Sequence, residues 1–306
     1  MSSSTFRDQA DAWVIRALQL AARGARGILI NNHKQNAQQI RTQVEALAPF
    51  FTFIGYDDLK VRLNSTPSKK PFCLMTFDDG KAINATETAS ELLRLGVPAV
   101  LYIVTGAMGS EKAFWFDRLT ALRTAVGTGA LPGYSELEAI PWRVREQTIN
   151  ELCNRFGVEA DLLDPTVRVM SWDEATRLQR DGFEIGSHTV NHALLTGETP
   201  EEARRQIEDS MKHIVQHGLR ACRTFAFPKG RSSHSLVEIA LSAGLESTVS
   251  TAPTWVRKRD ALASLPRLYF KEKATDLHIH TKTLAARAGC LLPNPNREGR
   301  RYLFGT

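Results

Sequence analysis

A chain of 306 residues with 42% hydrophobic content can bury a sizeable core, either as two ordinary domains or as one large α/β barrel. Its 39 Lys and Arg against 33 Asp and Glu leave a net charge of +6, which suits an anionic partner or serves solubility alone. No short segment combines clustered Lys and Arg with interleaved aromatic residues, so we exclude a nucleic-acid partner.

The N-terminal segment, residues 1–30, carries charges throughout, among them Asp8, Arg16 and Arg26. These charges interrupt the apolar core that a signal peptide needs. No stretch of the sequence reaches the roughly 18 to 20 apolar residues of a membrane span. We therefore expect a cytoplasmic protein without a transmembrane segment, although a processed chain would look the same. Its basic charge is compatible with peripheral contact with a membrane.

Short apolar runs recur along the chain, and a helical pattern follows most of them. Seven runs are expected strands: GILIN from Gly27, PFCLMTF from Pro71, VPAVLYIV from Val97, FEIGSH from Phe183, TFAFP from Thr224, STVST from Ser247 and LPRLYF from Leu265. This alternation is typical of a parallel sheet with crossover helices. The expected fold class is therefore α/β, a closed or nearly closed (β/α) barrel of about seven strands.

Helical spacing of apolar residues predicts crossover helices over 82–95 and 200–217. From 106 to 182 no strand pattern occurs, and amphipathic stretches lie near 115–126 and 141–156. We interpret 106–182 as a helical insertion between the third and fourth strands, within a single domain spanning 1–306. The insertion could be a lid over the barrel mouth, an interaction surface or decoration.

Polar residues follow several of the expected strands. Asp78 and Asp79 end the second strand in MTFDDG, His188 ends the fourth, and Lys229 follows the fifth. In a parallel barrel these strand ends meet on one rim, where catalytic residues collect. Adjacent carboxylates repel each other, so some other group must favour Asp78 and Asp79 side by side.

A histidine pair offers that group. GSHTVNH places His188 and His192 four residues apart, where the chain turns, so that both imidazoles can reach one metal ion. The spacing alone is a weak signal, but beside Asp78 and Asp79 it becomes strong. A divalent cation would be ligated by one carboxylate and leave the other free to take a proton.

TFDDG followed by SHTVNH resembles the first two motifs of the polysaccharide deacetylase superfamily, carbohydrate esterase family 4, over roughly 27–289. The resemblance implies a distorted barrel of about seven strands and hydrolysis of N-acetyl or O-acetyl groups on sugars. It also implies one divalent metal ion, usually zinc, with Asp78 as general base and Asp79, His188 and His192 as ligands. Three protein ligands leave an open position at which a water can be activated.

FAFPKG resembles the third motif of the family, with two departures. Lys229 stands at the family's tyrosine, and Ala226 stands at the arginine that orients the base. The resemblance implies an oxyanion-stabilising backbone N–H here, while the Lys229 ammonium could meet an anionic group of the substrate. Either another cation orients Asp78 or that role is unfilled. Our candidate is Arg267, whose alternative role is an ordinary surface ion pair.

The expected function is removal of an N-acetyl or O-acetyl group from an amino sugar in a polysaccharide, an oligosaccharide or a lipid-linked, anionic precursor. Two alternatives stay open: hydrolysis of another C–N amide on the same barrel, and an inactive carbohydrate-binding relative. We assign no general acid. His278 and His280 are expected on a terminal helix, and neither His33 nor His234 lies in a strong motif.

Overall fold

The structure, a computed structural model, describes residues 25–65, 70–111, 113–129, 131–257, 262–270 and 279. Its centre is one sheet with the strand order β7-β6-β5-β4-β3-β1-β8, in which β2 pairs with β3 and β9 pairs with β1. The strands are β1 (Ala25–Asn32), β2 (Thr52–Phe53), β3 (Phe72–Phe77), β4 (Ala99–Ile103), β5 (Glu184–Ser187), β6 (Ala221–Ala226), β7 (Ser247–Val249), β8 (Val256–Arg257) and β9 (Leu268–Tyr269).

All seven expected strands are confirmed, as β1, β3, β4, β5, β6, β7 and β9. The pairs from β1 through β7 are parallel, whereas β8 runs antiparallel to β1. Every residue of β3 and β4 is buried, as continuous apolar runs in a parallel sheet require.

The segment 262–270 joins the two ends of this sheet. Leu265 bridges to Val249 in β7, and its backbone N–H donates to the Thr248 carbonyl at 2.8 Å. A few residues later, β9 pairs with β1 through Leu268 and Ile30. The strands therefore curl into the distorted (β/α) barrel that the sequence predicts.

Two buried clusters occupy the two faces of the barrel wall. Alternate strand residues such as Met75 and Leu101 pack outward against the covering helices. Their neighbours Leu74 and Val100 pack inward, together with Tyr102. The alternation continues along β3, so that Thr76 and then Asp78 follow Leu74 on the inner side.

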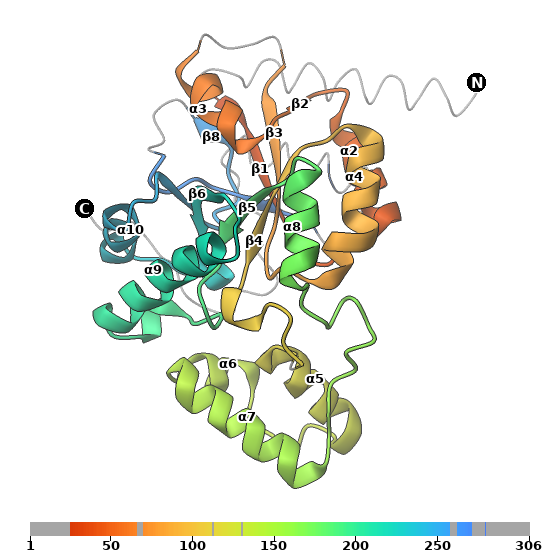
Figure 1. The fold of residues 1–306 in the computed structure, drawn as a ribbon, viewed down its shortest axis with the longest axis vertical. Coiled ribbons are helices and arrows are strands. Elements are labelled where there is room, and N and C mark those ends of the chain that lie inside the picture. Colours follow the sequence, from red (N-terminus) through yellow and green to blue (C-terminus); the bar gives the residue numbers. More distant parts are fainter. Residues whose placement is uncertain are drawn as a thin grey trace, which may run out of the picture.

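Helices cover the outside of the barrel and extend beyond it (Figure 1). They are α2 (Ala37–Leu47), α3 (Tyr56–Asn64), a π-helical segment η1 (Asn84–Thr88) continuing into α4 (Ala89–Leu95), α5 (Trp115–Val126), α6 (Tyr134–Glu138), α7 (Trp142–Phe156), α8 (Trp172–Arg180), α9 (Pro200–Gln216) and α10 (His234–Ser242). The expected helix over 200–217 begins as its sequence indicates, since the Thr199 side chain accepts a hydrogen bond from the Glu202 N–H and Pro200 occupies the first turn. Among the described residues, no helix combines the length and apolar character needed to cross a membrane.

The expected helical insertion lies between β4 and β5. Its helices α5, α6 and α7 form a lobe beside the barrel (Figure 1), packed around Trp115, Leu119, Leu137 and Ile149. Helix α8 belongs to the barrel, because it packs against β5 and the π-helical segment. We call residues 113–156 the insertion lobe. That residues 1–306 form a single domain stays a prediction.

Candidate metal centre and active site

Three loops at the carboxyl ends of neighbouring strands carry most of the predicted site residues. We call them the rim loops: residues 78–81 after β3, 188–194 after β5 and 227–231 after β6. The strands β3, β5 and β6 are all part of the parallel run, so their ends meet at one rim. Arg267 reaches the same rim from just before β9.

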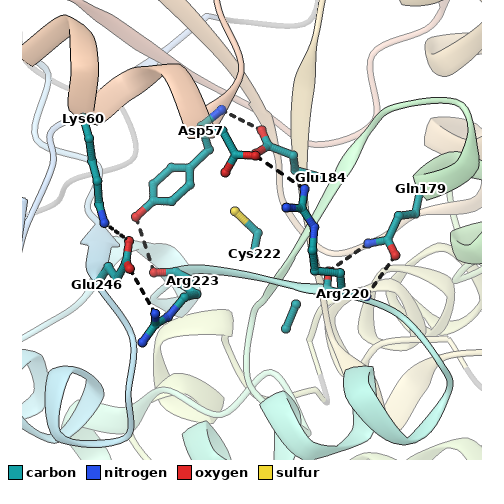
Figure 2. A pocket seen from close by; sticks show the side chains of 10 residues that line it. Asp57, Lys60, Gln179, Glu184, Arg220, Cys222, Arg223 and Glu246 are labelled. Atoms are coloured by element: carbon teal, nitrogen blue, oxygen red, sulfur yellow. Dashed lines mark hydrogen bonds and ion pairs between the residues drawn. The ribbon is translucent and has the colours of Figure 1, made fainter.

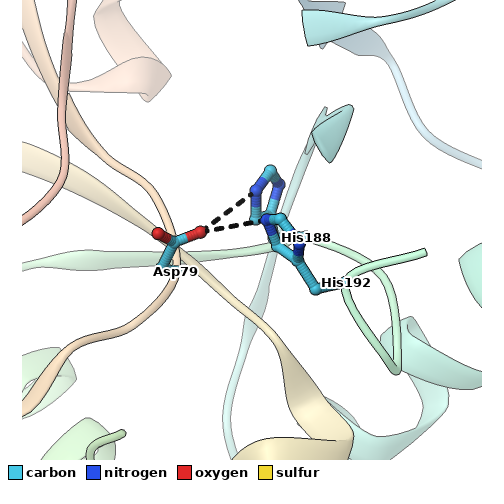
Figure 3. Close-up of side chains that lie close together, drawn as sticks. All are labelled: Asp79, His188 and His192. Atoms are coloured by element: carbon cyan, nitrogen blue, oxygen red, sulfur yellow. Dashed lines mark ion pairs between the residues drawn. The ribbon is translucent and has the colours of Figure 1, made fainter. Parts of the chain in front are cut away.

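Asp79, His188 and His192 form one buried cluster. The Asp79 carboxylate lies 3.5 Å from His188 Nε2 and 3.3 Å from His192 Nε2. Figure 3 shows both imidazoles turned toward the same carboxylate oxygen. One ligand atom from each residue lies within 4.8 Å of the other two, so the three can hold a single ion.

The hydrogen bonds of the two histidines fit a metal site. His188 Nδ1 lies 2.6 Å from the Ala226 carbonyl, to which it donates, so that Nε2 faces Asp79 and is the nitrogen available to a metal ion once it has lost its proton. His192 Nδ1 is buried and has no hydrogen-bond partner among the described residues. Two imidazoles and one carboxylate are a donor set that zinc accepts.

The backbone of the rim loops is held in an unusual conformation. Among the described residues, four that are not glycine have positive φ: Asp79 at 74°, Thr189 at 72°, His192 at 50° and Lys229 at 57°. All four lie in the rim loops. Left-handed conformations of this kind cost on the order of 1 kcal/mol or more each and persist only where surrounding contacts enforce them.

Asp78 is held by Arg267. The two carboxylate oxygens accept hydrogen bonds of 2.7 Å from Arg267 Nη1 and Nη2. The fully buried guanidinium also donates to Thr76 Oγ1 at 3.0 Å and to the Ser250 carbonyl at 3.1 Å. Arg267 therefore contacts Asp78 in the interior and does not form a surface ion pair, while its role in orienting a general base stays a prediction.

The electrostatics keep both carboxylates ionised. Burial raises the pKa of Asp78, but the nearby Arg267 guanidinium outweighs it and the net shift is downward. Burial likewise opposes the charged form of Asp79, and the hydrogen bonds from His188 and His192 bring its pKa well below the usual range. The negative charge of the two carboxylates therefore favours binding of a cation in the cluster.

Lys229 is less free than its sequence position suggests. Its ammonium forms an ion pair with Glu138 at the end of α6, and Arg231 binds the other oxygen of the same carboxylate at 2.9 Å. The side chain is thus attached to the insertion lobe. Roles for Lys229 toward a substrate or oxyanion stay predictions.

Two other histidines that the sequence analysis named, His33 and His234, lie in the described part of the chain. The His33 ring, directly after β1, contacts the edge of Tyr269 at 5.9 Å between ring centroids. His234 is exposed on α10 and lies 3.2 Å from Glu238. His278 and His280 lie outside the described residues. A general acid is therefore not assigned.

Sequence reasoning missed the residues that attach the insertion lobe to the rim: Lys81, Asp117, Glu138 and Arg145. Only one signal pointed to them, the position of Lys81 directly after the TFDDG motif. An acidic or basic residue on an amphipathic helix usually faces solvent, so the sequence offered no reason to single out the other three.

A cavity of about 290 Å³ lies at the opposite end of the barrel, among Tyr56, Glu184 and Cys222 (Figure 2). Glu184 and Ala221 begin β5 and β6, so this cavity is separated from the rim by the length of the strands. Its charged groups neutralise one another, with Glu246 contacting Lys60 and Arg223. We assign it no role.

The fold and the rim define an α/β barrel with a possible Asp-His-His metal site at the carboxyl ends of its strands. The family model for polysaccharide deacetylases matches residues 65–248, and the chain belongs to this family. This confirms the resemblance that the motifs indicated.

Individual relatives are distant. YxkH of Bacillus subtilis (strain 168), whose name assigns it to the polysaccharide deacetylases, is 24% identical over 96 residues. That match covers 31% of this chain and 34% of YxkH, so it spans about a third of the relative's length.

Solved structures share the fold over most of the chain. The deacetylase PplD of Streptococcus pyogenes superimposes with a TM-score of 0.60 at 15% identity, covering 85% of this chain and 99% of PplD. IcaB from Ammonifex degensii gives 0.58 at 15% identity, covering 85% and 97%. At such identities the likeness establishes the barrel fold and nothing finer.

Proposed function

We propose that this chain is a metal-dependent hydrolase that removes an N-acetyl or O-acetyl group from an amino sugar in a polysaccharide, an oligosaccharide or a lipid-linked glycan precursor. The observation that carries the proposal is the buried Asp79, His188 and His192 cluster beside a carboxylate, Asp78, held by Arg267. Membership of the polysaccharide deacetylase family supports it. The PplD structure was determined in complex with acetate, which supports acetate as the product.

We assign the metal-ligand role to Asp79, His188 and His192, with zinc as the ion. When bound, the ion would supply Lewis-acid activation of the acyl carbonyl and of the attacking water. The donation from His188 Nδ1 to the Ala226 carbonyl aims Nε2 into the cluster, where metal binding would displace any proton that it carries.

We assign the general-base role to Asp78. Each of its oxygens accepts one hydrogen bond from Arg267 and retains a second lone pair, which can take the proton of the attacking water. Arg267 holds the carboxylate in one orientation and favours its ionised form. The tetrahedral oxyanion would be stabilised by a backbone N–H of the 227–231 rim loop, the segment that carries Lys229.

The proposed substrate is a class of acetylated glycans rather than a single compound. The net charge of +6 favours an anionic or lipid-linked glycan. Hydrolysis of another amide would release ammonium or a different acid, and an inactive relative would bind sugars without turnover.

A panel of acetylated amino sugars, oligosaccharides and nucleotide sugars tests the proposal by acetate release. We expect about one zinc per chain in the purified protein and loss of activity when a chelator removes it. His188→Ala should lose both metal and activity. Asp78→Asn should keep the metal and lose activity by about 10²- to 10⁴-fold, because no proton acceptor is left.

His234→Ala serves as the matched control, because this exposed histidine lies on α10 away from the cluster. Full acetate release by chelator-stripped protein would overturn the metal-dependent mechanism. Ammonium release without acetate would identify the other amide hydrolase instead.

A further inference from the structure

Each helix of the insertion lobe contacts a different rim loop through a charged side chain. Helix α5 contacts the 78–81 loop, α7 contacts the 188–194 loop and α6 contacts the 227–231 loop. These loops contain all four left-handed residues that are not glycine in the described part of the chain. Contacts from the lobe therefore accompany the left-handed backbone conformations in all three rim loops.

The first contact joins α5 to the loop of Asp79. Lys81 is 2% exposed, and its ammonium lies 2.5 Å from Asp117 and 2.8 Å from the Val167 carbonyl. The Phe114 ring lies against the same ammonium, 4.4 Å from Nζ to the ring centroid. Lys81 is therefore fixed from several sides, two residues from a proposed ligand.

The second contact joins α7 to His192. Arg145 is fully buried, its guanidinium lies 4.8 Å from the Trp115 ring centroid, and its Nη2 donates to the His192 carbonyl at 3.2 Å. Its Nε and Nη1 have no hydrogen-bond partner among the described residues. Burying a guanidinium with two such nitrogens lowers the stability of the fold. The contact with the strained His192 is therefore a candidate for a functional role.

The third contact joins α6 to the 227–231 loop. The Glu138 side chain is 7% exposed and binds both Lys229, which has positive φ, and Arg231. A single buried carboxylate thus holds the loop at two points.

We propose that the insertion lobe is a three-point brace that holds the rim loops in their strained conformations, with Arg145 as the positioning residue for His192. Arg145 acts through the His192 carbonyl and touches no reacting atom. The consequence for metal binding rests on the proposed function. The consequence for the backbone does not, because the loop can be observed without a metal.

The test compares Arg145→Gln with Arg143→Gln, which removes the same charge from an exposed position on the same helix. Cobalt(II) titration, followed by visible absorption, reports the affinity and ligand geometry of the cluster. Hydrogen exchange in metal-free protein reports the opening of the 188–194 loop.

We expect Arg145→Gln to weaken cobalt binding by about tenfold, as loss of an outer contact to a metal ligand does. Amides of the 188–194 loop should exchange about tenfold faster, because a charge-assisted hydrogen bond is lost. Arg145→Lys should restore part of both, since it keeps a charged donor. Arg143→Gln should match the wild type in both measurements.

The two readouts separate the two proposals. Unchanged loop exchange in Arg145→Gln would overturn the brace, whatever the metal does. A wild-type protein that binds no cobalt would overturn the proposed function. The hydrogen-exchange comparison in metal-free protein would still test whether the lobe holds the 188–194 loop. If Arg145→Gln does not fold, Glu138→Gln replaces it, with faster exchange expected in the 227–231 loop and unchanged exchange there counting against the brace.

Discussion

Asp78 and Arg267 lose their hydration when the barrel buries them together, and attraction offsets that loss only when the geometry is good. Here two hydrogen bonds of 2.7 Å join them, and Thr76 and Ser250 occupy further guanidinium donors. Such an arrangement restricts the carboxylate to one orientation. A proton acceptor beside a metal centre needs that restriction, because misplacement by about 1 Å can cost 10²-fold in rate.

Arg267→Lys tests this positioning at the residue scale. Lysine keeps the positive charge but lacks the planar fork that binds both carboxylate oxygens. We expect kcat for acetate release to fall by about 10²-fold, with KM and zinc content little changed. Arg223→Lys, an exposed arginine at the opposite end of the barrel, is the control. An unchanged kcat would show that Asp78 does not need the fork.

The sequence could predict those candidate site residues that lie within short motifs. Motif spacing at strand ends indicated the histidine pair and the adjacent carboxylates, the family resemblance selected Asp79 as the ligand, and the structure brings Asp79, His188 and His192 together. Arg145 could not be predicted, because its burial depends on how α7 docks against a loop 47 residues away. An arginine on an amphipathic helix is usually solvated, and nothing in its neighbourhood indicates otherwise.

At the scale of elements, strands that lie within longer apolar runs were predictable, including the two-residue β9 within LPRLYF, whereas strands outside such runs were not. β2 and β8 are two residues each, and a run of two has no periodicity. Residues 82–95 are helical as expected, but the segment Asn84–Thr88 is π-helical. Apolar spacing does not distinguish the two helix types over a single turn, since their periods barely diverge.

Helices α2 and α4 are tied together by Glu91. Its carboxylate lies 2.8 Å from Arg41 Nε and 2.6 Å from Arg94 Nη2, and its side chain is 6% exposed. Hydrogen bonds from Arg94 and then Arg41 lower the pKa of Glu91 to about 2. A carboxyl with a depressed pKa stabilises the fold above its ordinary pKa and loses that contribution as pH falls through the folded value.

Glu91→Gln should therefore lower the free energy of unfolding at neutral pH, and its difference from the wild type should shrink as pH falls from about 4.5 toward about 2. Denaturant unfolding of both proteins across this range measures the difference. Glu87→Gln, an exposed glutamate one turn earlier, should have the smaller effect at neutral pH. A constant difference at all pH values would contradict the ion-pair explanation.

At the scale of the whole molecule, the site depends on closure of the barrel. The segment 262–270 bridges β7 and β1 and so carries Arg267 to Asp78 across 189 residues of sequence. The cluster likewise joins loops that follow β3 and β5, with the insertion lobe between them in sequence. An ion held by Asp79, His188 and His192 would therefore cross-link distant parts of the fold.

Zinc should accordingly stabilise the entire barrel. A ligand that binds only the folded chain adds about 2.7 kcal/mol to the free energy of unfolding when its free concentration is a hundred times Kd. We expect thermal unfolding of chelator-treated protein to shift upward with added zinc, and far less with magnesium, which prefers oxygen ligands. His188→Ala should remove the zinc shift, because two donors alone bind weakly, whereas His234→Ala should keep it. A zinc shift of the same size in His188→Ala would mean that the ion binds elsewhere on the protein.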